Sequence, residues 1–517
     1  MSKTNQIKAG AILSYLQMGL GVVVSLLYTP LMIRILGKSE YGLYNTVAST
    51  ISMLSILSMG FNSSYIRFYT KYRKAEDQLS IYKLNGLFMI VFLIISAIAL
   101  LCGTFLTFNL DLVFRDGLIE AEYELARKLM ILLTVNLTLS FPMSVFSNII
   151  SAHERFVFLK TLSVIKTVGS PLLTIPLLLL GYGSVAIVAV TLAVSLAVDT
   201  TYMIFVFFRL RQKFVFRGFE KGLFKSLFVF TGFIAINMVV DQININIDKV
   251  LLGRFKGTEV VAVYSVGFTL YVYFQHFSTS LSHLFTPKVH ALVRSTEDQP
   301  AEQRKQLTAL FTRVGRIQFI ILGLVASGLV FFGKDFILRW AGSGYDDSYY
   351  VTLLLVLPSM IPLIQNIGIE IQRAENNHKF RSIAYLLMAI INFVLSVFLC
   401  QLYGAVGSAI GTAISLVVAN GVVINIYYHK KCNVDVLYFW KSILRMLPGL
   451  IIPVGAAVAA SFFIRYDTIW KLIGGIAVYT LIYCVSVWFL SMNGEEKNLV
   501  LNVIKKVTRA FRRLLKR

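Results

Sequence analysis

The sequence predicts an all-α integral membrane protein with about fourteen transmembrane helices. Hydrophobic residues make up 57% of its 517 positions and charged residues only 15%. A soluble chain of this length carries more charge and has shorter apolar runs. The apolar stretches recur along the whole chain, and each is close to the ~20 residues that a spanning helix requires. A third observation, the distribution of basic residues, supplies the orientation.

The expected spans follow one another with short connections that leave no room for a large soluble domain. The first stretch lacks a signal-peptide cleavage pattern, and its length suits a retained span. The longest connections, 109–128 outside and 286–313 inside, could not house a catalytic domain. We place the spans at residues 11–34, 42–66, 84–108, 129–150, 158–180, 184–208, 226–252, 260–285, 314–333, 350–371, 382–400, 405–428, 447–464 and 469–490.

The net charge of +23 follows this topology and does not indicate a nucleic-acid partner. If the N-terminus is cytoplasmic and the connections alternate, roughly three quarters of the 49 Lys and Arg lie in cytoplasmic segments. The acidic residues divide about evenly between the two sides. Only the connection at 249–256 fits poorly. This positive-inside bias predicts a multi-pass membrane protein with both termini in the cytoplasm.

A weak internal repeat with an offset near 220 residues relates the two halves of the chain. GKSEYGLY at 37–44 resembles KGTEVVAVY at 256–264, and GYGSVA at 181–186 resembles LYGAVG at 402–407. AHERF at 152–156 has a looser counterpart in AENNHKF at 374–380. Because six spans separate equivalent helices, the repeat is parallel. We expect an N-terminal lobe at 1–210, a C-terminal lobe at 226–430, two extra spans at 445–490 and a basic amphipathic tail at 494–517.

The tail has one apolar and one basic face, which is typical of a helix lying on the anionic cytoplasmic leaflet. The alternative is a disordered basic tail that only enforces topology. The four cysteines share no spacing, so we expect packing residues and neither a disulfide framework nor a metal site. They are Cys102, Cys400, Cys432 and Cys484.

A polar stripe interrupts the span at 226–252. Asn237, Asp241, Asn244 and Asp248 stand at i, i+4, i+7 and i+11, so on a helix they share one narrow face. Ionisable groups at membrane depth are costly and usually face a bundle interior or a water-filled cavity. Asp241 and Asp248 are candidates to bind a coupling Na⁺ or H⁺, or to orient substrate hydroxyls. The alternative is a structural seam of interhelical hydrogen bonds.

Two further features extend this predicted cavity. An uncharged polar stripe at the equivalent place in the first span comprises Ser14, Gln17, Gly21 and Ser25. Lys166 is the only basic residue clearly at membrane depth, where its ammonium would suit a phosphate or another anion. It could equally pair with Asp199, which should lie at a similar depth on the next helix.

His276, His283 and His290 repeat every seven residues, which on a helix spans ~10 Å and is too far for one metal ion. Pro287 also interrupts the pattern. We expect a polar face running toward the cytoplasmic mouth, with His276 deepest, and no metal. Arginines and a lysine cluster at helix ends, mostly as anchors, and a few could line a vestibule for an anionic headgroup. They are Arg34, Arg67, Arg155, Lys160, Arg313, Arg316 and Arg373.

The chain lacks the common signatures of catalysis. No GxxxxGK[ST] phosphate loop, HExxH pair or GxSxG elbow occurs in the sequence. We therefore expect a protein that is not an enzyme and has no cofactor beyond a coupling ion. Any transport would draw its energy from an ion gradient, the membrane potential or a downstream sink.

Four sequence segments carry a family resemblance. They are YTPLMIRILGKSEYGLYN at 28–45, IDKVLLGRF at 247–255, TPK at 286–288 and GAVGSAIGTAIS at 404–415. The chain resembles the polysaccharide-biosynthesis flippases, of O-antigen or teichuronic type, which share a superfamily with drug exporters and lipid II flippases. The resemblance covers nearly the whole chain, but its motifs are structural and identify the superfamily better than the substrate.

The resemblance implies flipping of an undecaprenyl-pyrophosphate-linked oligosaccharide from the cytoplasmic to the outer leaflet of a bacterial plasma membrane, by alternating access. It also implies membrane lipids and glycan polymerase machinery as partners, and we expect a monomer. In similar proteins the central cavity is often cationic, whereas the residues named here are more acidic. Either Lys166 and the helix-end arginines supply positive charge, or the headgroup is bound through hydroxyl contacts. The alternatives are a cation-coupled exporter of amphipathic drugs and, further off, a membrane glycan polymerase or ligase.

Overall fold

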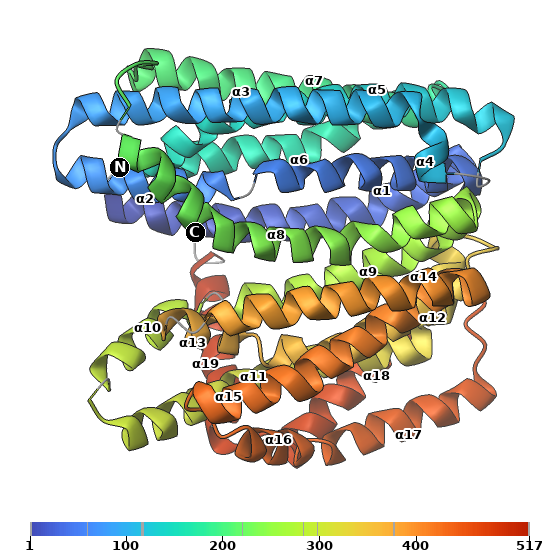
Figure 1. Cartoon of the computed structure of the whole chain (residues 1–517). Coiled ribbons are helices and arrows are strands. Elements are labelled where there is room, and N and C mark those ends of the chain that lie inside the picture. The colour runs from blue at the N-terminus through green and yellow to red at the C-terminus, as the bar shows by residue number, and fades with distance from the viewer. Residues whose placement is uncertain are drawn as a thin grey trace. The chain divides into compact units, whose positions relative to one another are not determined.

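The computed structural model describes residues 3–58, 60–114, 118–219, 221–282, 284–296, 298–375 and 378–514. Every regular element in these ranges is a helix (Figure 1). The predicted all-α membrane fold is therefore confirmed. Each of the fourteen expected spans overlaps one or more of the helices.

Ten helices among the described residues are long and apolar enough to cross a membrane, or eleven if one bent pair forms a single span. The count of fourteen stays a prediction, and the difference has clear sources. Two of the ten are far longer than one span, with 66 and 52 residues, and each contains a break at a glycine, Gly37 or Gly404. The helix that carries the polar stripe is not among the ten.

The glycine breaks recur at equivalent places in the internal repeat. Gly37 and Gly257 have φ values of 74° and 86°, and Gly183 and Gly404 have φ values of 61° and 57°. Backbone in this region is open to glycine at little steric cost but strained for residues with a Cβ. Both members of each pair thus have a positive φ of similar size.

The first of two compact units comprises Met1–Thr269 and Lys379–Ser415. Figure 1 shows α3, α5 and α7 as long neighbouring helices of this unit, and α1 packs against α6 and α8. Its elements are α1 (Lys3–Met53), η1 (Leu54–Ser58), α2 (Phe61–Lys74), α3 (Gln78–Phe108), α4 (Leu110–Phe114), α5 (Glu120–Ala152), α6 (Phe156–Leu179), α7 (Gly183–Ile204), the π-helix η2 (Phe205–Arg209), α8 (Lys221–Phe255), the first part of α9 (Thr258–Ser282) and nearly all of α14 (His378–Leu416).

An aromatic core lies between α2, α3 and α5 of the first unit. Phe61 meets Phe88 and Phe92 edge to face, with ring centroids 6.4 and 6.3 Å apart. Tyr65 is fully buried and donates a hydrogen bond of 2.6 Å to Oδ1 of Asn85. The hydroxyl of a buried tyrosine requires such a partner, so this pair fixes the register of α2 on α3.

The second unit comprises Leu270–His378 and Leu416–Arg517. In it α11 packs against α12, α16 and α18. Its elements are the end of α9, α10 (Thr286–Ser295), α11 (Pro300–Trp340), α12 (Asp347–Ile364), α13 (Ile367–Ala374), the π-helix η3 (Val417–Ile424), α15 (Asn425–Lys431), α16 (Val436–Leu444), α17 (Pro448–Phe463), α18 (Ile469–Leu490) and α19 (Gly494–Leu514). The units group helices differently from the lobes at 1–210 and 226–430, whose boundaries rest on the sequence repeat and stay a prediction.

A buried ion pair joins four segments of the second unit. Nε and Nη2 of Arg316 donate to the two carboxylate oxygens of Glu496 at 2.6 and 2.9 Å, and Glu496 is 2% exposed. The guanidinium also donates to the carbonyl oxygens of Ser442 and Ser491. A bidentate pair with its remaining donors satisfied is the arrangement in which a buried charge is stable. Arg316 therefore fixes the start of α19.

The C-terminal tail is helical, as expected of an interfacial segment. Its location on the membrane surface stays a prediction, because most side chains beyond residue 502 lie outside the described part of the structure. The connection at 109–128 contains α4, and that at 286–313 contains α10 and the start of α11. Neither forms a separate domain.

Candidate functional site

The polar stripe on α8 divides into two environments. Asn237 and Asp241 are exposed, Asn244 is half-buried and Asp248 is 1% exposed. All four belong to the first unit. The two carboxylates that share one helix face in the sequence therefore meet different surroundings and have to be considered separately.

Three hydroxyl groups surround the Asp248 carboxylate. Tyr264 on α9 donates to Oδ2 at 2.6 Å, Ser408 on α14 donates to Oδ1 at 2.7 Å, and Thr412 donates to Oδ2 at 2.9 Å. Hydrogen bonds to a charged acceptor are stronger than neutral ones. Asp248 thus joins α8 to α9 and α14. The segments 247–255 and 404–415, which carried the family resemblance, meet at this carboxylate.

Asp241 lies in a more open polar site. The charged group that acts on its carboxylate is the guanidinium of Arg381, near the start of α14. Arg381 lies over the ring of Tyr385 at 4.7 Å, and its Nη1 is buried without a hydrogen-bond partner among the described residues. Asn237 lies one helical turn before Asp241 on α8, and the hydroxyl of Ser382, next to Arg381, donates a hydrogen bond to Oδ1 of Asn237 at 3.1 Å. The site therefore presents a carboxylate, a guanidinium, an amide and an aromatic ring.

The sequence analysis did not identify Arg381, although the arrangement leaves a signal. Arg381 and Tyr385 stand at i and i+4 where an apolar run begins, so they share a helix face. The expected span at 382–400 leaves Arg381 in the connection before it. The helix begins at His378 and includes it.

Lys166 and Asp199 lie near one another on α6 and α7, and their charges attract across the interface between these helices. Both are half-buried. This supports the pairing as one of the two roles weighed for Lys166 and leaves anion binding open. A Cβ added to Gly21 of α1 would lie 3.7 Å from Thr167, so the uncharged stripe passes close to Lys166.

Gln17 and Ser25 are half-buried on α1, and the Ser25 and Thr29 hydroxyls are 3.4 Å apart. Since α1 packs against both α6 and α8, the two polar stripes belong to neighbouring helices.

His276 is half-buried on α9 in the second unit, His290 lies on α10, and His283 lies outside the described residues. In the described ranges no three His, Cys, Asp or Glu side chains form a group that could hold a metal ion.

Most of the helix-end basic residues already interact with protein groups. Arg373 pairs with Glu370 at 2.8 Å, Arg313 pairs with Glu495 at 3.6 Å, and Arg316 holds Glu496. Arg34 and Arg67 also have interaction partners. Arg155 differs, because it lines a pocket. The general expectation of a cationic vestibule stays a prediction.

The equivalent turns of the repeat contact each other within the first unit. A Cβ on Gly42 would lie 1.8 Å from the carbonyl oxygen of Thr258, so only glycine permits this approach. The Glu122 carboxylate of α5 accepts hydrogen bonds from the hydroxyls of Ser39 and of Thr258, the latter at 2.9 Å. Lys38 and Glu259 form an ion pair at 3.6 Å beside them. These residues, 38–42, Glu122 and 258–259, are called the turn contact below.

Comparison with known proteins defines the class to which this fold belongs. The fold matches the lipid II flippase MurJ in its inward closed conformation with a TM-score of 0.71, at 17% identity over 92% of this chain and 97% of that one. It matches an inward-facing multidrug resistance transporter of the MATE family with a TM-score of 0.58, at 16% identity over 83% and 99%. The chain therefore has the fold that these two proteins share.

Sequence comparison then identifies the family. Residues 7–285 match the family described as polysaccharide biosynthesis protein, and the chain belongs to that family. A protein of Shigella flexneri named as an O-antigen transporter is 20% identical over 78% of this chain and 92% of its own length. An uncharacterized membrane protein of Bacillus subtilis, EpsK, is 22% identical over 94% and 96%. The predicted resemblance to the polysaccharide-biosynthesis family is confirmed.

Proposed function

We propose that this protein flips a lipid-linked oligosaccharide from the cytoplasmic to the outer leaflet of a bacterial plasma membrane. The observation that carries the proposal is the pair of opposite charges Asp241 and Arg381 on α8 and α14, two helices that cover expected spans of a flippase fold. Charges at such positions are rare unless they serve a substrate or an ion. The substrate is then an undecaprenyl-pyrophosphate glycan, handed to glycan polymerase machinery outside.

Each group at this site suits one part of such a headgroup. The Arg381 guanidinium can form paired hydrogen bonds with a phosphate, and its buried Nη1 has a donor to offer. The Asp241 carboxylate can accept hydrogen bonds from sugar hydroxyls, and the Asn237 amide can both accept and donate them. The Tyr385 ring suits the apolar face of a sugar. Arg381 supplies positive charge next to the acidic residues of the polar stripe. Lys166 is a second candidate contact for the phosphate.

Asp241 is also the better candidate for coupling to Na⁺ or H⁺. Its carboxylate is exposed, whereas the oxygens of Asp248 already accept three hydroxyl donors. A coupling site must take up and release its ion in each cycle, which favours the accessible group. In this scheme Asp248 keeps α8, α9 and α14 together, while Asp241 binds and releases the coupling ion.

Alternating access gives the turn contact a role. It closes one end of the first unit, the external end in the predicted topology, by joining residues 38–42 to Thr258 through Glu122. Breaking two hydroxyl bonds and one exposed ion pair is a small cost compared with opening a packed helix interface. The contact is therefore suited to form and break in each transport cycle.

A second function, cation-coupled export of amphipathic drugs, is favoured by one observation. The exposed acid Asp241 beside the ring of Tyr385 would suit a cationic amphiphile, and the fold also matches a multidrug transporter. Arg381 opposes this, because a guanidinium at the same site repels a cation. A glycan polymerase or ligase finds no support in the helical connections.

A deletion strain distinguishes these functions. Loss of the gene should abolish the surface glycan, cause lipid-linked oligosaccharide to accumulate in the cell and leave drug susceptibility unchanged. Complementation with Arg381→Gln should restore about a tenth of the wild-type glycan or less, since the loss of a paired phosphate contact of ~1.4 kcal/mol is tenfold. Arg445→Gln, at an exposed arginine at the end of α16, is the matched control and should complement fully. Increased drug sensitivity with intact surface glycan would overturn the proposal.

A further inference from the structure

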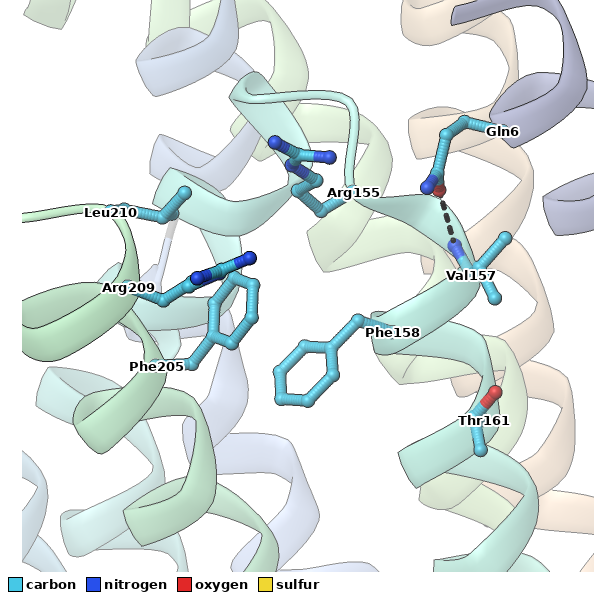
Figure 2. A pocket seen from close by; sticks show the side chains of 8 residues that line it. All are labelled: Gln6, Arg155, Val157, Phe158, Thr161, Phe205, Arg209 and Leu210. Atoms are coloured by element: carbon cyan, nitrogen blue, oxygen red, sulfur yellow. Dashed lines mark hydrogen bonds between the residues drawn. The ribbon is translucent and has the colours of Figure 1, made fainter. Parts of the chain in front are cut away.

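A basic pocket of about 590 Å³ lies in the first unit where α6 begins and η2 ends, away from Asp241 in the sequence and on other elements. Figure 2 shows its lining: the guanidinium groups of Arg155 and Arg209 lie on one side, with the rings of Phe158 and Phe205 beside them. Gln6 of α1 closes another side. None of the eight lining residues is acidic.

The acidic residue next to Arg155 in the chain is paired with an arginine outside the pocket. Glu154, which precedes Arg155, forms an ion pair with Arg73 at 3.8 Å. The N-terminus of α6 adds positive potential, because Arg155 gives it no side-chain cap. Its Val157 N–H is weakly bonded to Oε1 of Gln6 at 3.4 Å. Two guanidinium groups and a helix N-terminus together favour a multiply bonded anion such as a phosphate.

The walls of the pocket favour an amphiphile over a free anion. The Phe158 and Phe205 rings stack with centroids 4.1 Å apart and form a fixed apolar floor. Phe207 and Phe208, on the same helix end as Arg209, are 44% and 80% exposed. Exposed aromatic side chains beside basic groups are typical of the membrane interface, where the headgroup is polar and the chains are apolar.

We propose that this pocket binds the phosphate ester of an anionic lipid, with Arg155 and Arg209 on the phosphate oxygens and the aromatic rings against its first apolar groups. Both arginines lie at the end of the helices that the charge bias predicts to be cytoplasmic. Pockets of this size hold small ligands, and a glycerophosphate headgroup fits within it. The lipid is either a bulk phospholipid or a polyprenyl phosphate, which share this chemistry. The proposal does not depend on the transport function.

Direct lipid binding to the purified full chain in neutral detergent tests the proposal. The probes are phosphatidylglycerol, undecaprenyl phosphate, inorganic phosphate and diacylglycerol, which has no headgroup charge. For the anionic lipids, Arg155→Gln/Arg209→Gln should raise Kd about tenfold or more, since two charge-assisted contacts are lost. Arg155→Lys/Arg209→Lys should recover only part of the affinity, because an ammonium keeps the charge but loses the paired geometry.

The control is Arg217→Gln/Arg445→Gln, which removes the same charge at exposed arginines outside the pocket and should change Kd less than about twofold. Tighter binding of undecaprenyl phosphate than of phosphatidylglycerol assigns the site to the polyprenyl lipid, and equal binding assigns it to the bulk membrane. Equal losses in both double Gln variants would overturn the proposal, because charge alone would then explain binding. Diacylglycerol binding as tightly as the anionic lipids, or inorganic phosphate binding without lipid, would also overturn it.

Discussion

At the scale of single residues, the two aspartates on one face of α8 have opposite surroundings. Asp248 accepts hydrogen bonds from Tyr264, Ser408 and Thr412, whereas Asp241 is exposed and faces the charge of Arg381. Spacing on a helix establishes that side chains share a face, but it does not say which neighbouring helix covers each turn of that face. The structural and the functional roles weighed for the stripe can thus both hold, at different residues.

This contrast predicts different effects of the same substitution at the two positions. Asp248→Asn replaces a carboxylate oxygen with an amide donor that faces hydroxyl donors, and should lower the free energy of unfolding by about 2–3 kcal/mol. Asp241→Asn, the matched control, should stay within about 0.5 kcal/mol of the wild type because the side chain is exposed. Unfolding of the purified protein in detergent, followed by circular dichroism, provides the comparison. Equal stability of the two variants would show that the three hydroxyl bonds do not hold the helices together.

At the scale of elements, the equivalent turns of the repeat meet at the turn contact. Gly42 allows the α1 backbone to approach Thr258, and the Glu122 carboxylate accepts hydrogen bonds from hydroxyl groups on both turns. Glu122 lies in the acidic connection 109–128, where the sequence shows only a run of acids. The hydrogen bond between Glu122 and Thr258 joins residues that are 136 positions apart in the sequence, so the sequence pattern does not predict it.

Cross-linking the turn contact should stop transport if the two turns separate in each cycle. The Ser39 and Thr258 hydroxyl oxygens are 3.5 Å apart, within reach of a disulfide after Ser39→Cys/Thr258→Cys in a background without the four native cysteines. Oxidation should abolish glycan export, and reduction should restore it. The single variant Ser39→Cys controls for the substitution and should respond to neither treatment. Export that continues in fully cross-linked protein would mean that the turns stay together throughout the cycle.

At the scale of the whole molecule, the sequence predicted the fold class and the family. Apolar periodicity carries this information because each span must satisfy its own backbone in the membrane. Span boundaries were less certain where helices run on past the bilayer, as α11 does over Pro300–Trp340. The glycine turns could be anticipated from the repeat, since Gly37 and Gly257 are equivalent in the sequence and share a backbone conformation.

The candidate site was only partly predictable, because its members come from distant segments. The sequence analysis identified Asp241 but neither Arg381 nor Tyr385, and it could not assign Ser408 and Thr412 to Asp248. Short polar side chains in apolar helices can donate hydrogen bonds either to backbone carbonyls of their own helix or to distant side chains. Their spacing in the sequence does not tell these two roles apart. The pocket beside Arg155 also needs Arg209, which lies 54 residues further along the chain.

The most direct test of the central claim is transfer of a fluorescent undecaprenyl-pyrophosphate oligosaccharide between the leaflets of proteoliposomes, read by its accessibility to an external quencher. The account predicts that the wild-type protein moves the glycolipid across the bilayer. Asp241→Asn and Arg381→Gln should each slow this transfer about tenfold or more, while Arg445→Gln does not. Glycolipid that stays in its original leaflet in the presence of folded wild-type protein, under an imposed Na⁺ or H⁺ gradient and without one, would contradict the account.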